Sequence, residues 1–177
     1  MSGRLFFAVT PSIDVAGRIY RLAEVVKRAR QFDGSLTSID RLHVTLFFLD
    51  GGSDAREYVV RMACEAAQEV RMSSFEVSFD RIASFRGRPD HHPFVLLGGD
   101  GLKGLKLFRR TLGAQMARNG LKRLVNSDFN PHVTLLYAER EVEEHPIEPI
   151  FWMVDAFVLI HSMNGHTQLA RWPLRVE

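Results

Sequence analysis

The chain has 177 residues, of which 46% are hydrophobic and 25% charged, and this composition is typical of a folded soluble protein. No uninterrupted apolar run approaches the roughly 20 residues of a membrane-spanning helix, and the single cysteine, Cys64, excludes an intrachain disulfide framework. The formal charge of +2 is too small to indicate nucleic-acid binding by itself, and a reducing, cytoplasmic location without membrane contact is the expectation.

The first half of the chain alternates predicted strands and helices. Residues 4–9 form a strand that starts at once, without the pattern of a signal peptide. Pro11-Ser12 begins a helix with apolar residues at helical spacing, up to about residue 32. A second strand covers about 42–49 and is closed by a turn signal over 50–53, after which Asp54 is expected to cap the next helix.

The second half is predicted to hold more strands than helices. Alternating apolar residues mark a half-buried strand over 74–83, followed by a polar, basic loop and a buried strand over 93–98. A third helix is expected to end at Gly120, before a strand over about 131–137. The final elements are an acidic connection, a strand, a hairpin turn and a last strand, over 138–149, 152–161, 164–165 and 166–173.

The order of these elements, β-α-β-α-β-β-α-β-β-β, favours an α+β fold with mostly antiparallel sheets over a doubly wound parallel sheet. The β-α-β unit over 4–49 is echoed by a looser one over 93–137. We therefore expect a single domain over 1–177, built as two pseudo-symmetric lobes that form a central cleft and carry their helices on the outside.

A short motif occurs once in each of these units. His43-Val44-Thr45-Leu46 recurs 89 residues later as His132-Val133-Thr134-Leu135, in both cases on the strand that follows the helix. Side chains alternate across a strand with period 2, so the histidine and threonine of each copy point to one face. Two such strands facing each other would place two imidazoles and two hydroxyls in one cleft.

This set of groups suits phosphodiester chemistry. With an unperturbed pKa of about 6.5, one imidazole can be neutral and the other protonated near pH 7. Cleavage needs a base for the nucleophile and an acid for the leaving oxygen. The hydroxyls of Thr45 and Thr134 can hold non-bridging phosphate oxygens, and the scheme requires no metal and no cofactor. One such motif would more often be structural, but the second copy makes a catalytic pair the stronger interpretation.

The chain resembles the two-histidine (2H) phosphoesterase superfamily, and within it the bacterial RNA 2′,3′-cyclic phosphodiesterases, also called 2′-5′ RNA ligases. The similarity includes the opening Arg4-Leu5-Phe6-Phe7-Ala8, both histidine motifs, and the ending Leu169-Ala170-Arg171-Trp172-Pro173. The resemblance implies that His132 is the proton acceptor that activates water and His43 the proton donor to the ribose 3′-oxygen. The implied product is a 2′-phosphate, and reversal of the reaction would join ends through a 2′-5′ linkage.

The resemblance also implies which molecules the protein binds, and it shows one position at which this chain differs from the family pattern. The expected partners are RNA ends or nucleotides with a 2′,3′-cyclic phosphate, bound by a monomer. Many members of the family continue the second motif into an arginine, where this chain has Leu136-Tyr137. Tyr137 and Arg86 are therefore the expected helpers at the phosphate, with Arg88 or Arg109 as other sources of positive charge.

Aromatic and basic residues give further expectations. Phe85, in a loop, is the better candidate for stacking on a base, whereas Phe47 and Phe48 are assigned to the core. The basic residues concentrated over 81–123 fit either a solvated surface or a basic surface beside a phosphate site.

Competing sites and functions remain open at this level. Asp90-His91-His92 matches part of a metal motif, but no further aspartates complete it and a solvated loop is favoured. Cys64 is interpreted as a small buried residue. His161 and His166 flank the hairpin turn and could reach the rim of the cleft, but structural roles are favoured. The alternatives to the cyclic phosphodiesterase are a 2H enzyme for another cyclic or 2′-5′-linked nucleotide, and a module that binds RNA terminal phosphates without turnover.

Overall fold

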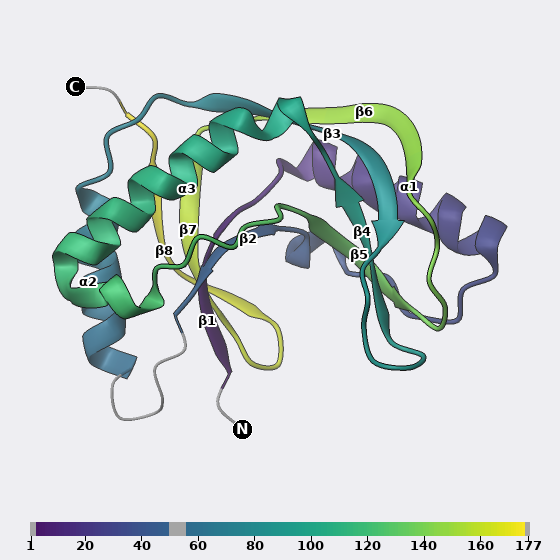
Figure 1. Cartoon of the computed structure of the whole chain (residues 1–177), viewed down its shortest axis with the longest axis horizontal. Helices are drawn as coiled ribbons and strands as arrows, with labels where there is room; N and C mark the ends of the chain where they lie inside the picture. The colour runs from purple at the N-terminus through teal and green to yellow at the C-terminus, as the bar shows by residue number, and fades with distance from the viewer. Residues whose placement is uncertain (1–2, 50–55, 176–177) are drawn as a thin grey trace.

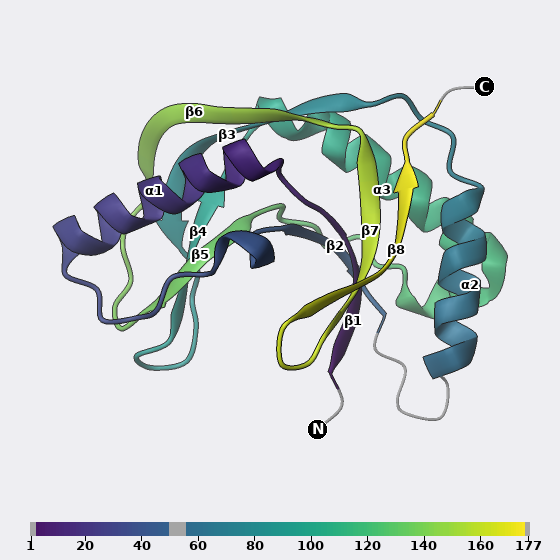
Figure 2. The same ribbon diagram turned by 180° about the vertical axis from the view of Figure 1, so that it is seen from behind.

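Two four-stranded antiparallel sheets form the frame of the protein (Figures 1 and 2). The computed structural model describes residues 3–49 and 56–175, so the expected turn at 50–53 and the Asp54 cap lie outside the described residues. The first sheet has the order β2-β1-β7-β8, formed by Val44–Phe48, Arg4–Val9, Ala156–Ser162 and His166–Pro173. The second has the order β5-β4-β3-β6, formed by Val133–Ala138, His92–Leu97, Phe75–Ser84 and His145–Val154.

The described residues form three α-helices beside the sheets: α1 (Ile13–Arg30), α2 (Arg56–Gln68) and α3 (Lys103–Met116). The Ser12 hydroxyl accepts a hydrogen bond from the Val15 N–H and caps α1, as the sequence predicts. Beyond α3 the chain turns at Gly120, whose φ of 83° suits glycine and marks the expected end of the helical stretch. Short helical turns complete the described elements, over Ile39–Arg41, Asp100–Leu102, Ala117–Leu121 and Lys122–Leu124.

The two β-α-β units correspond strand by strand. β1-α1-β2 and β4-α3-β5 each place the motif strand, β2 or β5, at the edge of its sheet. The α+β prediction, with antiparallel sheets and helices, is thus confirmed. α1 packs on β5 and β6, in the sheet of the other unit (Figures 1 and 2). α3 contacts β3 and also reaches β7, in the other sheet, through a Phe108–Phe157 ring contact. The main hydrophobic core consequently draws residues from both sheets and all three helices.

The acidic connection predicted over 138–149 and the strand predicted over 152–161 are wrong. Strand β6 begins at His145 and ends before Asp155, which separates it from β7. The described residues therefore form eight strands instead of the seven predicted. Pro146 and Pro149 hid β6 because proline cannot donate to a sheet ladder. β6 is an edge strand with β3 as its neighbour, so it tolerates both prolines. None of the described helices has the length and apolar character needed to cross a membrane.

Candidate active site

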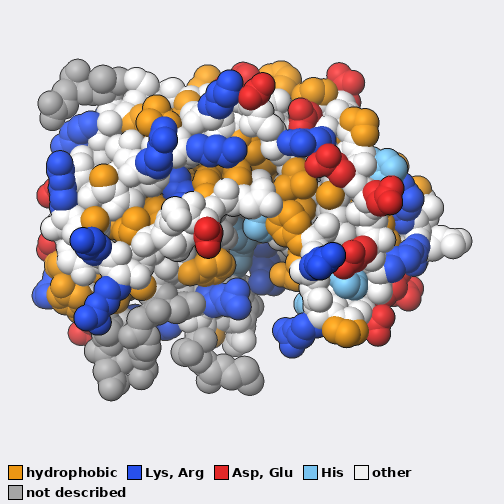
Figure 3. Space-filling model, viewed as in Figure 1, with side chains coloured by type: hydrophobic (Ala, Val, Ile, Leu, Met, Phe, Trp, Pro, Cys, Tyr) orange, Lys and Arg blue, Asp and Glu red, His pale blue; other side chains and the backbone are white. Residues whose placement is uncertain are grey.

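The two motif strands line one cavity of about 730 Å³. His43 and Thr45 come from β2 or its N-terminal end, and His132 and Thr134 from the matching positions at β5. Figure 3 shows histidine side chains in the hollow between the two halves of the molecule. The predicted shared face of each His/Thr pair is therefore present, and both pairs open on the same space.

A β-bulge follows the threonine in each motif strand. In β2 the register with β1 passes from Thr45 to Phe47, and in β5 the register with β4 passes from Thr134 to Leu136, so Leu46 and Leu135 are the extra residues. Beyond a bulge the alternation of faces is reversed. The residue five positions after each histidine therefore faces the cavity.

These two residues are Phe48 and Tyr137, which are 47% and 45% exposed. Phe47 is buried as expected, but the assignment of Phe48 to the core is wrong because the bulge turns it toward the cavity. The Arg4 guanidinium lies 5.3 Å from the centre of the Phe48 ring. The His91 ring stacks on Tyr137 with centroids 4.3 Å apart, so each wall carries an aromatic ring backed by a basic side chain.

His43 is held by three contacts. Its Nδ1–H donates to the Arg41 carbonyl at 2.7 Å, so in the neutral ring Nε2 is the acceptor and takes a hydrogen bond from the Thr45 hydroxyl at 3.0 Å. The ring stacks on Phe6 at 5.0 Å. Burial lowers the pKa of His43 to about 4, and positive charge on His166 and His132 acts in the same direction.

His132 is held in the same way. Its Nδ1–H donates to the Asn130 carbonyl at 2.8 Å, and its ring meets Phe85 edge-on with centroids 4.9 Å apart. Burial lowers the pKa of His132, while the bond to Asn130 opposes that shift. Within the described part of the chain, Nε2 of His132 has no hydrogen-bond partner, and His132 lines the cavity. In the neutral ring this nitrogen is the proton acceptor.

The cavity lining is cationic. Two arginines and a third histidine, Arg4, Arg41 and His166, join the two motif histidines, and no aspartate or glutamate is among its described lining residues. Sequence reasoning missed the two arginines as cavity residues, because both lie outside the basic range 81–123. The structural role expected for His166 has to be extended, because its ring lies 4.9 Å from that of His43.

The sequence-predicted helpers fall into two groups. Phe85 and Tyr137 line the cavity beside the histidines. Arg86 is exposed on the loop after Phe85 and is not among the lining residues, and Arg88 bridges to His91 within that loop. Arg109 cannot serve the phosphate as expected, because it is only 6% exposed and its guanidinium already donates to protein carbonyls.

The competing sites find no support. Among residues 3–49 and 56–175 no group of three or more His, Cys, Asp or Glu could hold a metal ion. In the Asp90-His91-His92 triplet, His91 stacks on Tyr137 and His92 lies 3.4 Å from the Glu141 carboxylate. Burial raises the pKa of the half-buried Cys64 thiol, which keeps it protonated and unreactive.

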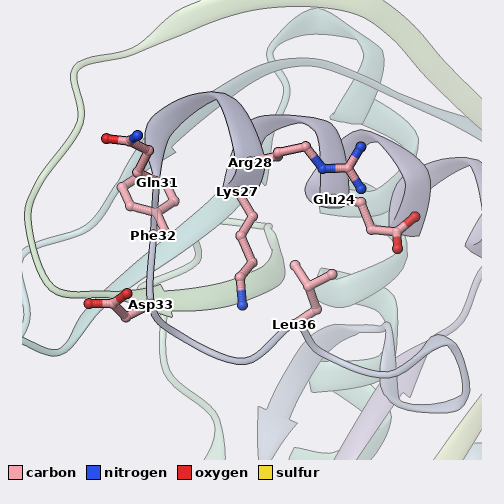
Figure 4. Close-up of a pocket in the computed structure, with 7 residues that line it drawn as sticks. All are labelled: Glu24, Lys27, Arg28, Gln31, Phe32, Asp33 and Leu36. Carbon is pink, nitrogen blue, oxygen red and sulfur yellow. The ribbon is translucent and has the colours of Figure 1, made fainter.

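One wall of the cavity is the segment over residues 34–38, which leads from α1 toward the first motif. Leu36 bridges to Leu136, and the Thr37 N–H donates to the Leu135 carbonyl at 2.8 Å. Leu36 also lines a second hollow of about 450 Å³ beside α1, where Lys27 Nζ donates to the Gly34 carbonyl at 2.7 Å (Figure 4). This partition segment therefore separates the two cavities, and it is hydrogen-bonded to β5 on one side and to α1 on the other.

Comparison with known proteins gives a family match over most of the chain. The sequence model of the 2′-5′ RNA ligase superfamily matches residues 19–166. No protein of curated function matches the chain.

Similar solved structures span the whole fold. A crystal structure described as a phosphoesterase is 28% identical, with a TM-score of 0.71 over 98% of this chain and 99% of its own. LigT of E. coli in its apo form is 27% identical, with a TM-score of 0.69 over 98% of each chain. The same E. coli protein in complex with 3′-AMP gives 27% identity and a TM-score of 0.67 over 98% of each chain.

Proposed function

Because this chain belongs to the 2′-5′ RNA ligase superfamily of two-histidine phosphoesterases, we propose that it hydrolyses 2′,3′-cyclic phosphate ends of RNA to 2′-phosphomonoesters. The observation that carries the proposal is the pair of His/Thr strands opening on one cationic cavity. A cyclic phosphate is a monoanionic diester, and it would meet basic and hydroxyl groups on every side.

In the proposed step the chain supplies the base, the acid and the hydroxyl donors, and water is the nucleophile. Nε2 of His132 takes a proton from water as its oxygen attacks phosphorus, and the bond between phosphorus and the 3′-oxygen breaks. The 3′-oxygen takes a proton from Nε2 of His43, which leaves a 2′-phosphate and a 3′-hydroxyl. The hydroxyls of Thr45 and Thr134 hold the non-bridging oxygens, and donors fixed in this way are worth several kcal/mol in a water-poor site.

The division of roles between the two histidines comes from the family resemblance, because burial lowers the pKa of both. With Nδ1 tied to the Asn130 carbonyl and a pKa lowered by burial, His132 is neutral near pH 7, as a base must be. His43 is also neutral in the empty cavity, with a pKa of about 4. A phosphate anion in the cavity favours the protonated form of a neighbouring imidazole, and the proposal requires that His43 carry this proton when the substrate is bound.

The size and walls of the cavity support a nucleotide as the substrate. About 730 Å³ lies within the range of roughly 300–1,000 Å³ typical of small-ligand sites. Phe48, Phe85 and Tyr137 offer ring faces or edges to a base or ribose. The E. coli relative has been crystallised with 3′-AMP, a nucleotide of the same class as the proposed substrate.

Several finer expectations belong to the same proposal. The reverse reaction would form a 2′-5′ linkage, Arg86 would contact the phosphate or the chain beyond it, and the enzyme would act as a cytoplasmic monomer.

Product analysis tests the proposal. Adenosine 2′,3′-cyclic phosphate, adenosine 3′,5′-cyclic phosphate and a 2′-5′-linked diadenosine are each incubated with the protein, and the products are identified by ³¹P NMR. We expect 2′-AMP from the first substrate only. Cleavage of one of the other two substrates alone would favour a two-histidine enzyme for another cyclic or 2′-5′-linked nucleotide. Tight binding of the first without product over hours would favour a binding module.

A further inference from the structure

Arg109 is the only charged side chain that is buried among the described residues. From α3 its Nε donates to the Leu46 carbonyl at 2.8 Å, and its Nη1 donates to the Asn126 carbonyl at 2.9 Å. Its Nη2 donates to the Asn126 Oδ1 at 2.9 Å and to the Asp128 carbonyl at 3.2 Å. One guanidinium thus joins strand β2 to the loop that leads into β5.

Two aromatic rings fix the plane of this guanidinium. The Arg109 Cζ lies 4.0 Å from the centre of the Phe47 ring and 4.6 Å from that of Phe129. Cation–π contact and four hydrogen bonds offset the cost of burying the charge. A planar fork can bond two chain segments between two rings, which an ammonium group cannot reproduce.

The bonds of Arg109 have a counterpart in the other unit. Leu46 is the bulged residue of β2, and its carbonyl is bonded by Arg109. Leu135 is the bulged residue of β5, and its carbonyl is bonded by the Thr37 N–H. Each motif strand is therefore hydrogen-bonded, just after its threonine, by the other β-α-β unit. The Arg109 side chain makes this bond to β2, and the Thr37 backbone makes it to β5.

Each of the two segments that Arg109 bonds lies within a few residues of a motif histidine. Leu46 follows Thr45, whose hydroxyl bonds Nε2 of His43. Asp128 lies two residues before Asn130, whose carbonyl bonds Nδ1 of His132. We propose that Arg109 is a positioning residue: it fixes the position of His132 relative to His43, because it bonds the loop before the second motif to the bulge of the first. The expected effect on catalysis rests on the function proposed above.

The test compares Arg109→Lys with Arg110→Lys, a change of the neighbouring arginine, which is exposed on the same helix. In protein labelled with ¹⁵N-histidine, the Nδ1–H resonances of His43 and His132 report their bonds to carbonyls. We expect Arg109→Lys to lose the His132 resonance selectively and to keep that of His43. We also expect kcat to fall roughly 10²-fold, with KM within threefold of wild type. Arg110→Lys should change neither resonance and neither constant.

The outcomes separate the two proposals. A folded Arg109→Lys variant with the His132 resonance and kcat of wild type would overturn the positioning role. So would a parallel loss of both histidine resonances, because it would show general loosening. If the wild-type protein lacks cyclic phosphodiesterase activity, the function proposed above fails, while the resonances still decide the role of Arg109.

A second pair of variants keeps the test decisive if Arg109→Lys does not fold. Asn126→Ala removes one acceptor of the guanidinium, whereas Asn126→Asp keeps an oxygen at that place. The positioning role requires that Asn126→Ala weaken the His132 resonance and lower kcat, and that Asn126→Asp restore both. Equal, wild-type behaviour of the two variants would overturn it.

Discussion

The ring of His166 lies edge-on to the ring of His43, with their centroids 4.9 Å apart and their planes at 71°. Both rings also touch Phe6, so β8 brings a third imidazole to the acid side of the cavity. A proton on His166 opposes a proton on His43, while Arg41 and Asp40 act on His166 in opposite directions. A neighbour outside the two motifs therefore adds to the effect of burial on the proton affinity of the proposed acid.

The pH dependence of kcat/KM follows from these shifts. The proposed mechanism needs neutral His132 and protonated His43, and burial lowers the pKa of both below the ordinary 6.5. The rising limb and the falling limb of the bell therefore both move to lower pH, and we expect the maximum below pH 6.5. His166→Phe keeps an aromatic ring in place but removes a charge, so the limb that His43 sets should move to higher pH. A wild-type maximum above pH 7.5, or two unchanged limbs in His166→Phe, would contradict this.

Each motif threonine should contribute to kcat through its hydroxyl. Thr134→Val keeps the shape of the side chain and removes the donor, and we expect kcat to fall roughly 10²-fold, as for loss of one donor to transition-state charge. Thr45→Val should fall at least as far, since it also removes the bond to Nε2 of His43. Thr134→Ser restores a hydroxyl and should recover most of the rate. Steady-state kinetics at saturating substrate decide, and full activity of Thr134→Val would exclude a role for its hydroxyl.

The stacked pair of Tyr137 and His91 should act on substrate affinity. Removal of a stacking surface costs ~1–3 kcal/mol per base, so Tyr137→Ala should raise KM between fivefold and 150-fold, roughly. Tyr137→Phe keeps the ring and should stay within threefold of wild type if stacking is the contribution. A large loss of kcat in Tyr137→Phe would instead assign the phenol to the phosphate, as the sequence first suggested.

Gly34 is required by the close approach of the partition segment to β5. A Cβ at Gly34 would overlap the Tyr137 carbonyl oxygen, which is backbone and cannot move aside. Gly34→Ala should therefore lower the free energy of unfolding by ~1–3 kcal/mol and impair activity by displacing the cavity wall. Gly17→Ala is the matched control, because Gly17 lies within α1 and its Cβ would come no closer than 3.7 Å to the Arg21 side chain. Denaturant unfolding of both variants checks this, and equal stability would refute it.

The sequence predicted the elements whose signals are local. Strand periodicity placed His43 with Thr45 and His132 with Thr134, and the repeated β-α-β pattern indicated that the two strands correspond. The bulges at Leu46 and Leu135 were not predictable, because a bulge is defined by the register with a neighbouring strand. For the same reason, Phe48 was assigned to the core although it faces the cavity.

Two arginines of the cavity were missed because neither belongs to a motif. Arg4 and Arg41 reach the cavity from β1 and from the turn before β2. His166 arrives on the last strand, and its contact with His43 depends on the pairing of β7 with both β1 and β8. Strand β6 was hidden by its prolines, which an edge position permits.

The central claim is that the two facing histidines cleave a cyclic phosphodiester by acid and base catalysis. The most direct measurement is the hydrolysis rate of an oligonucleotide with a 2′,3′-cyclic phosphate end, in the presence of EDTA, by wild type, His43→Asn and His132→Asn. We expect turnover by the wild type and a loss of at least roughly 10²-fold in each variant, with folding verified by circular dichroism. No turnover by the wild type, or a wild-type rate in either variant, would contradict the claim.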